Sequence, residues 1–195
     1  MNAPLELEIR IATETDRDSI EQLIFLSARE LSRGYYTDEQ IAAALARVYG
    51  VDSALIDDGT YFVAEADGIL VGCGGWSKRK TLFGGDQFAN RDSGLLDPRR
   101  DAAKIRAFFV HPNYTRRGIA RALLARCEAA ARRDAFSSFE LMSTLPGVEF
   151  YRACGFSSDD SILYDAGGVS LQFVPMKKTC PTQVRYKNSG KFRHL

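Results

Sequence analysis

Hydrophobic and polar residues follow two periods along this chain, and together these periods predict strands that alternate with helices. Near the amino end, every second position is apolar: Leu5, Leu7, Ile9 and Ile11. This period of two predicts a half-buried first strand. Apolar residues three and four positions apart then predict one helix over residues 13–34 and another over residues 37–50. Thr37 and Gln40 form a capping pattern at the start of the second helix.

The rest of the chain continues this alternation. Further strands are predicted at residues 61–66, 69–76, 105–110, 137–143, 161–164 and 169–174. Asp67 and Gly68 separate the first two of these strands, and this pair is typical of a tight hairpin. Helices are predicted from Arg116 and from Pro146. Residues 77–103 have no regular period, so we expect this long segment to be either mobile or functional.

The stretch from residue 104 to residue 124 joins a buried strand directly to a helix. Pro112 turns the chain out of the strand, and Arg116, Arg117 and Gly118 precede the apolar stripe of the helix. The first turn of a helix carries backbone N–H groups without partners, and a glycine lets a ligand approach the backbone closely. Because these groups and the helix dipole favour negative charge, the stretch predicts an anion site that suits a pyrophosphate.

Residues 115–120, with the sequence Thr-Arg-Arg-Gly-Ile-Ala, resemble the signature of the GNAT N-acetyltransferases. In that family, Gln/Arg-x-x-Gly-x-Gly/Ala at a strand-to-helix junction binds the pyrophosphate of acetyl-CoA. The chain departs from this signature at Thr115, which stands where the family has Gln or Arg. The family also carries Phe-Tyr-x-x-x-Gly-Phe at the end of a short helix, and this second motif is matched by Phe150, Tyr151, Gly155 and Phe156.

The resemblance implies a single α/β domain with a mixed, mostly antiparallel sheet flanked by helices. It also implies an enzyme that uses acetyl-CoA as co-substrate and moves the acetyl group directly to a primary amine of a small molecule or peptide. The residues that it implies for acetyl-CoA binding are Phe109, Val110, Arg116, Arg117, Gly118, Ile119, Ala120 and Arg121. Tyr151 matches the tyrosine that protonates the departing CoA thiolate in many members. The alternatives are a solvated basic helix face for the arginines and a tyrosine at the edge of the core.

The acceptor pocket and the catalytic base are less well defined. By resemblance, the acceptor lies over Trp76, the segment 77–103 and the pair Tyr35 and Tyr36. Many relatives carry a glutamate on the strand before the pyrophosphate loop, whereas this strand contains Arg106 and no carboxylate. The base therefore stays open, with these candidates: Glu65, Asp86, His111 and Glu140. An acyl-CoA-binding sensor or scaffold of the same fold is the alternative to the enzyme, and turnover distinguishes the two.

Composition and residue spacing argue against several other classes of function. A chain of 195 residues with 45% hydrophobic content suits one domain. The net charge of +1 gives no general attraction to nucleic acid or to membranes. Four cysteines and two histidines without metal-ligand spacing predict neither a metal site nor a disulfide framework. The glycine-rich run at residues 72–75 does not open a helix, so a dinucleotide-binding oxidoreductase is not expected.

The organisation expected from the sequence is simple. We expect an N-acetyltransferase domain over residues 1–176 and a basic carboxy-terminal tail over residues 177–195. No apolar run is long enough to span a bilayer and no secretory pattern is visible, which predicts a cytoplasmic protein without a membrane partner. The expected partner is the amine substrate, and the protein is expected to be a monomer or a homodimer.

Overall fold

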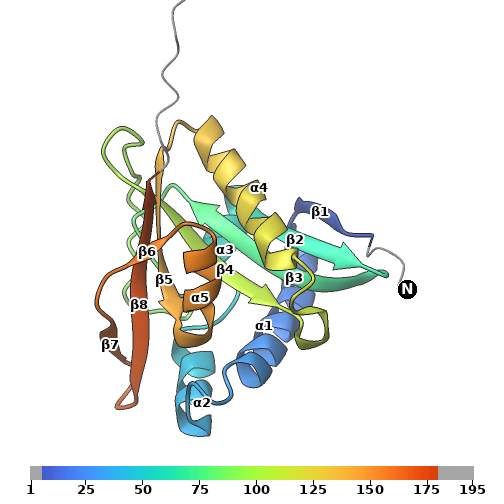
Figure 1. Ribbon diagram of the computed structural model, residues 1–195, viewed down its shortest axis with the longest axis vertical. Coiled ribbons are helices and arrows are strands. Elements are labelled where there is room, and N and C mark those ends of the chain that lie inside the picture. Colours follow the sequence, from blue (N-terminus) through green and yellow to red (C-terminus); the bar gives the residue numbers. More distant parts are fainter. Residues whose placement is uncertain (1–5, 180–195) are drawn as a thin grey trace, which may run out of the picture.

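The structure is a computed structural model and describes residues 6–179. Within these residues the helices are α1 (Arg17–Leu31), α2 (Asp38–Arg47), α3 (Ser53–Asp57), α4 (Ile119–Arg133) and α5 (Val148–Ala153). The strands are β1 (Glu8–Ile11), β2 (Tyr61–Ala66), β3 (Ile69–Ser77), β4 (Ala103–Val110), β5 (Ser138–Thr144), β6 (Ser157–Ser158), β7 (Ile162–Asp165) and β8 (Ser170–Thr179). Figure 1 shows these elements in sequence colours.

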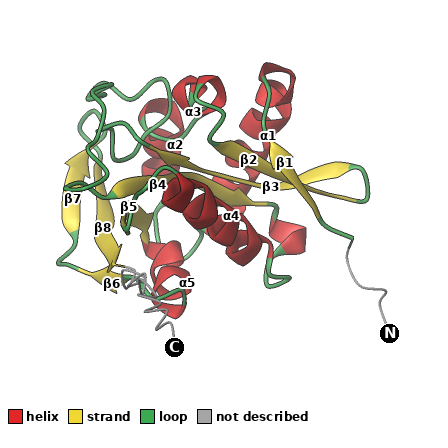
Figure 2. Ribbon diagram, turned by 90° about the horizontal axis from the view of Figure 1, so that it is seen from above, coloured by secondary structure: helices red, strands yellow, loops and turns green. Residues whose placement is uncertain are grey.

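The strands form one mixed sheet between two layers of helices. Their order is β1-β2-β3-β4-β5-β8-β6, and β7 pairs with the other part of β8. Neighbouring strands are antiparallel except for β4 and β5, which are parallel. Helices α1, α2 and α3 lie on one side of the sheet, and α4 and α5 lie on the other (Figure 2). The predicted α/β class with a mostly antiparallel sheet is therefore confirmed.

Parallel pairing between β4 and β5 is confined to one end of the two strands. Ala103 pairs with Phe139 and Lys104 pairs with Glu140, and no further residue pairs join them. Beyond this point the two strands separate, so the sheet opens into a wedge (Figure 1). The edge of β4 over residues 105–110 has no strand partner on this side. Ala107 has a positive φ of 55° at the irregularity in the β3–β4 register, which bends the strand beside the opening.

Helix α4 begins later than the sequence predicts. The expected start was Arg116, but a short 3-10 turn over Pro112–Tyr114 comes first and the helix begins at Ile119. Arg116 and Gly118 have φ values of 62° and 84°, which are not helical. The prediction was wrong here because the spacing of apolar residues does not show where the backbone takes a positive φ. Helix α3 was not predicted either, since five residues are too few for a helical period.

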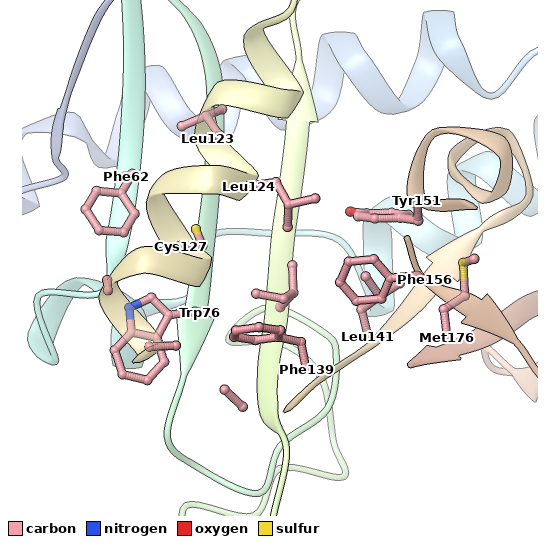
Figure 3. Packing of buried hydrophobic residues seen from close by; sticks show 14 of the residues in the cluster. Phe62, Trp76, Leu123, Leu124, Cys127, Phe139, Leu141, Tyr151, Phe156 and Met176 are labelled. Carbon is pink, nitrogen blue, oxygen red and sulfur yellow. The ribbon is translucent and has the colours of Figure 1, made fainter. Parts of the chain in front are cut away.

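The main core lies between the sheet and helices α4 and α5. Leu123, Leu124 and Cys127 of α4 pack over Phe62, Trp76 and Phe139 of the sheet, as Figure 3 shows. The glycines of β3 make this packing possible. A Cβ atom on Gly72 would lie 2.7 Å from Cγ2 of Ile119, and one on Gly74 would lie 2.7 Å from Phe108. The glycine-rich run therefore lets α4 and β4 approach β3 closely, and it lies within a strand.

The carboxy-terminal boundary extends slightly beyond the predicted one. Strand β8 continues to Thr179 because Ser138 and Ser157 pair with its last residues, so residues 177–179 belong to the sheet. The rest of the predicted tail, from Cys180, and the predicted strand position Leu5 lie outside the described residues. Over residues 6–179, no helix is long and apolar enough to cross a membrane. Three cysteines in this range, Cys73, Cys127 and Cys154, are free thiols.

Candidate active site

A cleft of about 440 Å³ occupies the wedge between β4 and β5. Its walls come from α1, the end of α2, the segment 82–85, β4, the first turn of α4, the end of β5 and the start of α5. The cleft therefore joins the predicted pyrophosphate loop to the predicted acceptor region. We call the part near α4 and α5 the cofactor end, and the part near α1, α2 and residues 82–85 the acceptor end.

The predicted cofactor-binding residues lie at the end of β4 and around the start of α4, although they do not all face the cleft. Phe109, Val110, Arg116 and Ala120 line it. Ile119 is the first residue of α4 and is buried in the core, where its side chain packs against β3. The remaining predicted residues, Arg117, Gly118 and Arg121, are exposed at the start of α4. The roles of all eight residues in binding stay predictions.

The backbone near Gly118 is built for close approach. Gly118 precedes the first residue of α4, and a Cβ atom there would meet nothing within 4 Å. Its positive φ suits glycine and strains any other residue. The first N–H groups of α4 have no helical partners, and Arg116 stands exposed beside them. Arg117 instead lies over the Tyr114 ring, with 5.0 Å between the guanidinium carbon and the ring centroid.

Two residues of β4 beside the opening already make internal hydrogen bonds. The Val110 amide donates a hydrogen bond of 3.3 Å to the Ser27 hydroxyl of α1. The Ala107 carbonyl accepts a long hydrogen bond of 3.4 Å from the Tyr61 hydroxyl. Both contacts hold the bent strand against the α1 side of the molecule, so the shape of the open edge is fixed by side chains behind it.

Tyr151 lies on α5 and lines the cofactor end of the cleft. It is 8% exposed and packs against the rings of Phe108, Phe150 and Phe156. Figure 3 shows its hydroxyl oxygen pointing from α5 toward β4 and Leu124. Burial, and then the nearby thiols of Cys127 and Cys154, raise the pKa of the phenol. Tyr151 therefore carries its proton at neutral pH, and no described residue accepts a hydrogen bond from it.

Aromatic side chains form the wall of the acceptor end. Tyr49 lies edge-on to Phe109 and to Phe173, with centroid distances of 5.8 and 6.5 Å. Phe83 of the segment 77–103 packs on Phe173 at 5.6 Å. Tyr35 completes this wall and is 55% exposed at the mouth. Part of the irregular segment 77–103 is thus folded against the cleft.

Two residues of the predicted acceptor pocket lie elsewhere. Trp76 is buried in the core under α4, on the other side of the sheet, where it contacts Phe136. That prediction was wrong because side chains of successive strand residues point to opposite faces. Tyr36 is a structural clamp: its hydroxyl donates to the Gln172 carbonyl at 2.6 Å and accepts from the Leu145 amide at 3.0 Å.

A buried group of three charged side chains lies behind the acceptor end. Asp52 is fully buried and lies 2.6 Å from Nη2 of Arg106 and 2.7 Å from Nη2 of Arg91. The two arginines also donate to the main-chain carbonyls of Gly84 and Gly85. Burial lowers the pKa of Arg106, although Asp52 acts in the opposite direction. This cluster fixes residues 84 and 85, which line the cleft.

None of the four candidate bases lines the cleft. Glu140 pairs with Lys104 and Glu65 pairs with Arg10. Asp86 accepts hydrogen bonds from the amide and hydroxyl of Ser53. His111 accepts from the Asn113 amide at 3.2 Å. Among residues 6–179, those that line the cleft include no aspartate, glutamate or histidine.

The family can now be assigned. The model of the acetyltransferase (GNAT) family matches residues 21–156, which is more than half of the chain and includes most of the cleft. The chain belongs to the GNAT acetyltransferase family. No curated protein sequence matches it significantly.

Solved structures support the same GNAT fold. A GCN5-related N-acetyltransferase from Rhodopseudomonas palustris has a TM-score of 0.66 at 20% identity, over 92% of this chain and 97% of the other. PaiA N-acetyltransferase from Thermoplasma acidophilum, in complex with coenzyme A, has a TM-score of 0.62 at 18% identity, over 89% and 99%. YncA, a putative acetyltransferase from Salmonella typhimurium with its cofactor acetyl-CoA, has a TM-score of 0.59 at 18% identity, over 91% and 96%.

Sequence reasoning missed most of the acceptor end of this GNAT protein. Ser27, Tyr49 and Phe173 line the cleft, and Asp52 anchors the arginines behind it. These residues come from separate elements and share no motif. One signal was visible: Arg106 is a lone charge inside an apolar strand, and a buried charge requires a partner. The identity of that partner, 54 residues earlier in the chain, could not be inferred.

Proposed function

We propose that this GNAT protein is an acetyl-CoA-dependent N-acetyltransferase that transfers the acetyl group directly to a primary amine of a small molecule or peptide. The observation that carries the proposal is the wedge between β4 and β5. It joins an anion-suited helix start, an open strand edge and a protonated buried tyrosine in one cleft. These three features suit the pyrophosphate, the pantetheine amides and the leaving thiolate respectively.

The residues present fit acetyl-CoA. The first-turn amides of α4 and the exposed Arg116 offer donors for phosphate oxygens, and Gly118 leaves room for close approach. The strand edge over residues 105–110 offers main-chain groups to an extended arm, as an added strand would use them. Displacement of the Ser27 hydroxyl would free the Val110 amide for the same purpose.

The chemical step needs a nucleophile and a proton for the leaving group. The amine lone pair attacks the thioester carbonyl carbon, and the carbon–sulfur bond breaks with its electron pair on sulfur. Tyr151 supplies the proton to that sulfur, which a phenol of high pKa does only as the negative charge develops. None of the three described cysteines lines the cleft, and this supports direct transfer over an acetyl-cysteine intermediate.

One observation favours a second candidate. The described residues that line the cleft offer no carboxylate or imidazole to remove a proton from an ammonium group. A protein that binds acyl-CoA as a sensor or scaffold would need none. Turnover separates the two functions, because both bind CoA and only the enzyme releases free thiol in the presence of an amine.

The test is a thermal-shift titration with acetyl-CoA, CoA and NADH, followed by an assay of thiol release with a panel of amines. A ligand at about 100 times its dissociation constant should stabilise the protein by roughly 2.7 kcal/mol. We expect stabilisation by both CoA species and not by NADH. No response to either CoA species would remove the proposal, whereas binding without turnover of any amine would favour the sensor.

A further inference from the structure

The electrostatic character of the acceptor end constrains the charge of the substrate. Within the described part of the chain, no acidic side chain lines the cleft, and the charged side chains that line it are Arg106 and Arg116. An ammonium ion that entered would lose water without gaining a counterion. Burying an unpaired charge in this way is costly, and a neutral amine avoids the cost.

The charge cluster behind the cleft also disfavours a positively charged substrate. Asp52 is shared by Arg91 and Arg106, so these three side chains carry one net positive charge. Asp86 lies 4.0 Å from Arg91, but it is 41% exposed and also contacts Arg17. The side chain of Arg106 is only 1% exposed, and its Nε and Nη1 atoms find no hydrogen-bond partner among the described residues. Its positive charge is only partly offset, because Asp52 is shared with Arg91.

The wall of the acceptor end suits a flat apolar group. Tyr49 and Phe83 both pack on Phe173, and Phe109 and Tyr35 extend the wall along the cleft. Aromatic walls bind either aromatic rings or cations. Because a buried arginine stands behind this wall and no carboxylate of residues 6–179 lines the cleft, the ring is favoured over the cation.

We propose that the acceptor is an aromatic amine that is neutral at physiological pH, such as an arylamine, rather than an alkylammonium compound. This inference rests on the proposed acetyltransferase function and names its substrate class. A neutral amine reaches the cleft with its lone pair free, so no base is needed before attack. An alkylamine as basic as lysine is neutral in only about one molecule in 10³ at pH 7.

The transfer balances without any further group. The nitrogen–carbon bond forms as the carbon–sulfur bond breaks, and the Tyr151 hydroxyl gives its proton to the sulfur. The acetylated nitrogen then carries one proton too many, and this proton returns to the Tyr151 oxygen. The products are a neutral amide and a CoA thiol, with Tyr151 restored. Tyr151 thus serves as acid and then as base, which accounts for a cleft without a carboxylate.

The experiment compares two isomers, 4-ethylaniline and 2-phenylethylamine, which share one formula and an aromatic ring. Thiol release from acetyl-CoA is measured at pH 7 for each amine, with the reaction lacking protein subtracted. We expect kcat/KM to be at least about tenfold higher for 4-ethylaniline, because the neutral fraction outweighs its weaker nucleophilicity. Equal values, a preference for 2-phenylethylamine, or turnover of neither isomer would overturn the inference.

A thermal shift with acetyl-CoA in the same samples distinguishes failure of the arylamine inference from failure of the acetyltransferase proposal. Stabilisation by acetyl-CoA together with the wrong preference removes the arylamine inference and leaves the acetyltransferase proposal intact. The absence of both stabilisation and turnover removes both.

A charge variant gives an independent check. Tyr35 is exposed enough to accept Glu, which adds a carboxylate to the mouth of the cleft. Relative to Tyr35→Gln, the Tyr35→Glu variant should raise the ratio of 2-phenylethylamine to 4-ethylaniline turnover about threefold or more. An identical ratio in the two variants would show that charge at the acceptor end does not govern the choice of amine.

Discussion

The two ends of the cleft are built in different ways. The cofactor end comes mainly from one continuous stretch, residues 109–121, whose backbone conformation presents the features expected to hold the ligand. The acceptor end is assembled from α1, the end of α2, residues 82–85 and β8, and it is held by buried side chains. A site made from backbone tolerates many side chains, whereas a site made from distant side chains depends on each of them. The following variants test that difference.

The largest effect is expected from Asp52→Ala, which leaves Arg91 and Arg106 without their buried counterion. Removing one partner of a buried ion pair costs about 3–5 kcal/mol of unfolding free energy. Urea unfolding measures this loss. The control is Asp159→Ala, which breaks an exposed pair with Lys177 and should cost at most about 1 kcal/mol. Equal losses in the two variants would mean that the cluster does not support the acceptor end.

Tyr151→Phe tests the buried tyrosine of α5. It removes the proton expected to reach the thiolate and keeps the ring contacts with Phe108, Phe150 and Phe156. We expect kcat to fall by about 10²-fold or more, with CoA affinity unchanged. Steady-state kinetics and a CoA titration measure the two quantities. A rate within about a factor of two of the native protein would end the assignment.

Gly118→Ala tests the backbone of the cofactor end. Gly118 has a φ of 84°, so alanine strains the turn from which the α4 amides point. We expect CoA affinity to fall by about tenfold, a change equivalent to about 1.4 kcal/mol. Gly68→Ala is a matched control, because Gly68 also has a positive φ and open space but lies in the β2–β3 hairpin. If both variants weaken CoA binding equally, general strain rather than the loop is responsible.

The smallest effect is expected from Tyr35→Ala at the acceptor end. Because Tyr35 is 55% exposed, its removal should cost little stability. The KM for the amine should rise by roughly twofold to fivefold while CoA affinity stays the same. Leu163→Ala, an exposed residue on β7, serves as the control and should alter neither quantity. Loss of CoA affinity in Tyr35→Ala would contradict the division of the cleft into two ends.

The same difference explains what could be predicted from the sequence. The alternation of strands and helices, the Thr37 cap and the Asp67-Gly68 hairpin are local patterns, and the structure confirms them. The motif around Gly118 is also local, although the true start of α4 depends on two positive φ values. By contrast, Arg106 meets Asp52 only through the folded chain. Trp76 was assigned to the wrong face because adjacent strand positions alternate and no pattern fixed the register.

The narrow junction between β4 and β5 has a further consequence. Strands β4 and β5 are linked directly by two residue pairs and by the Lys104–Glu140 ion pair. The sheet therefore consists of two plates, one ending at β4 and the other beginning at β5, that join at one corner. Side-chain packing under α4 and α5 also joins the plates (Figure 3), and on the other side of the sheet Tyr49 contacts both Phe109 of β4 and Phe173 of β8. An extended ligand bound along the wedge would act as a missing strand. It would tie the plates together, and amide hydrogen exchange in β4 and β5 would slow in parallel when the ligand is present.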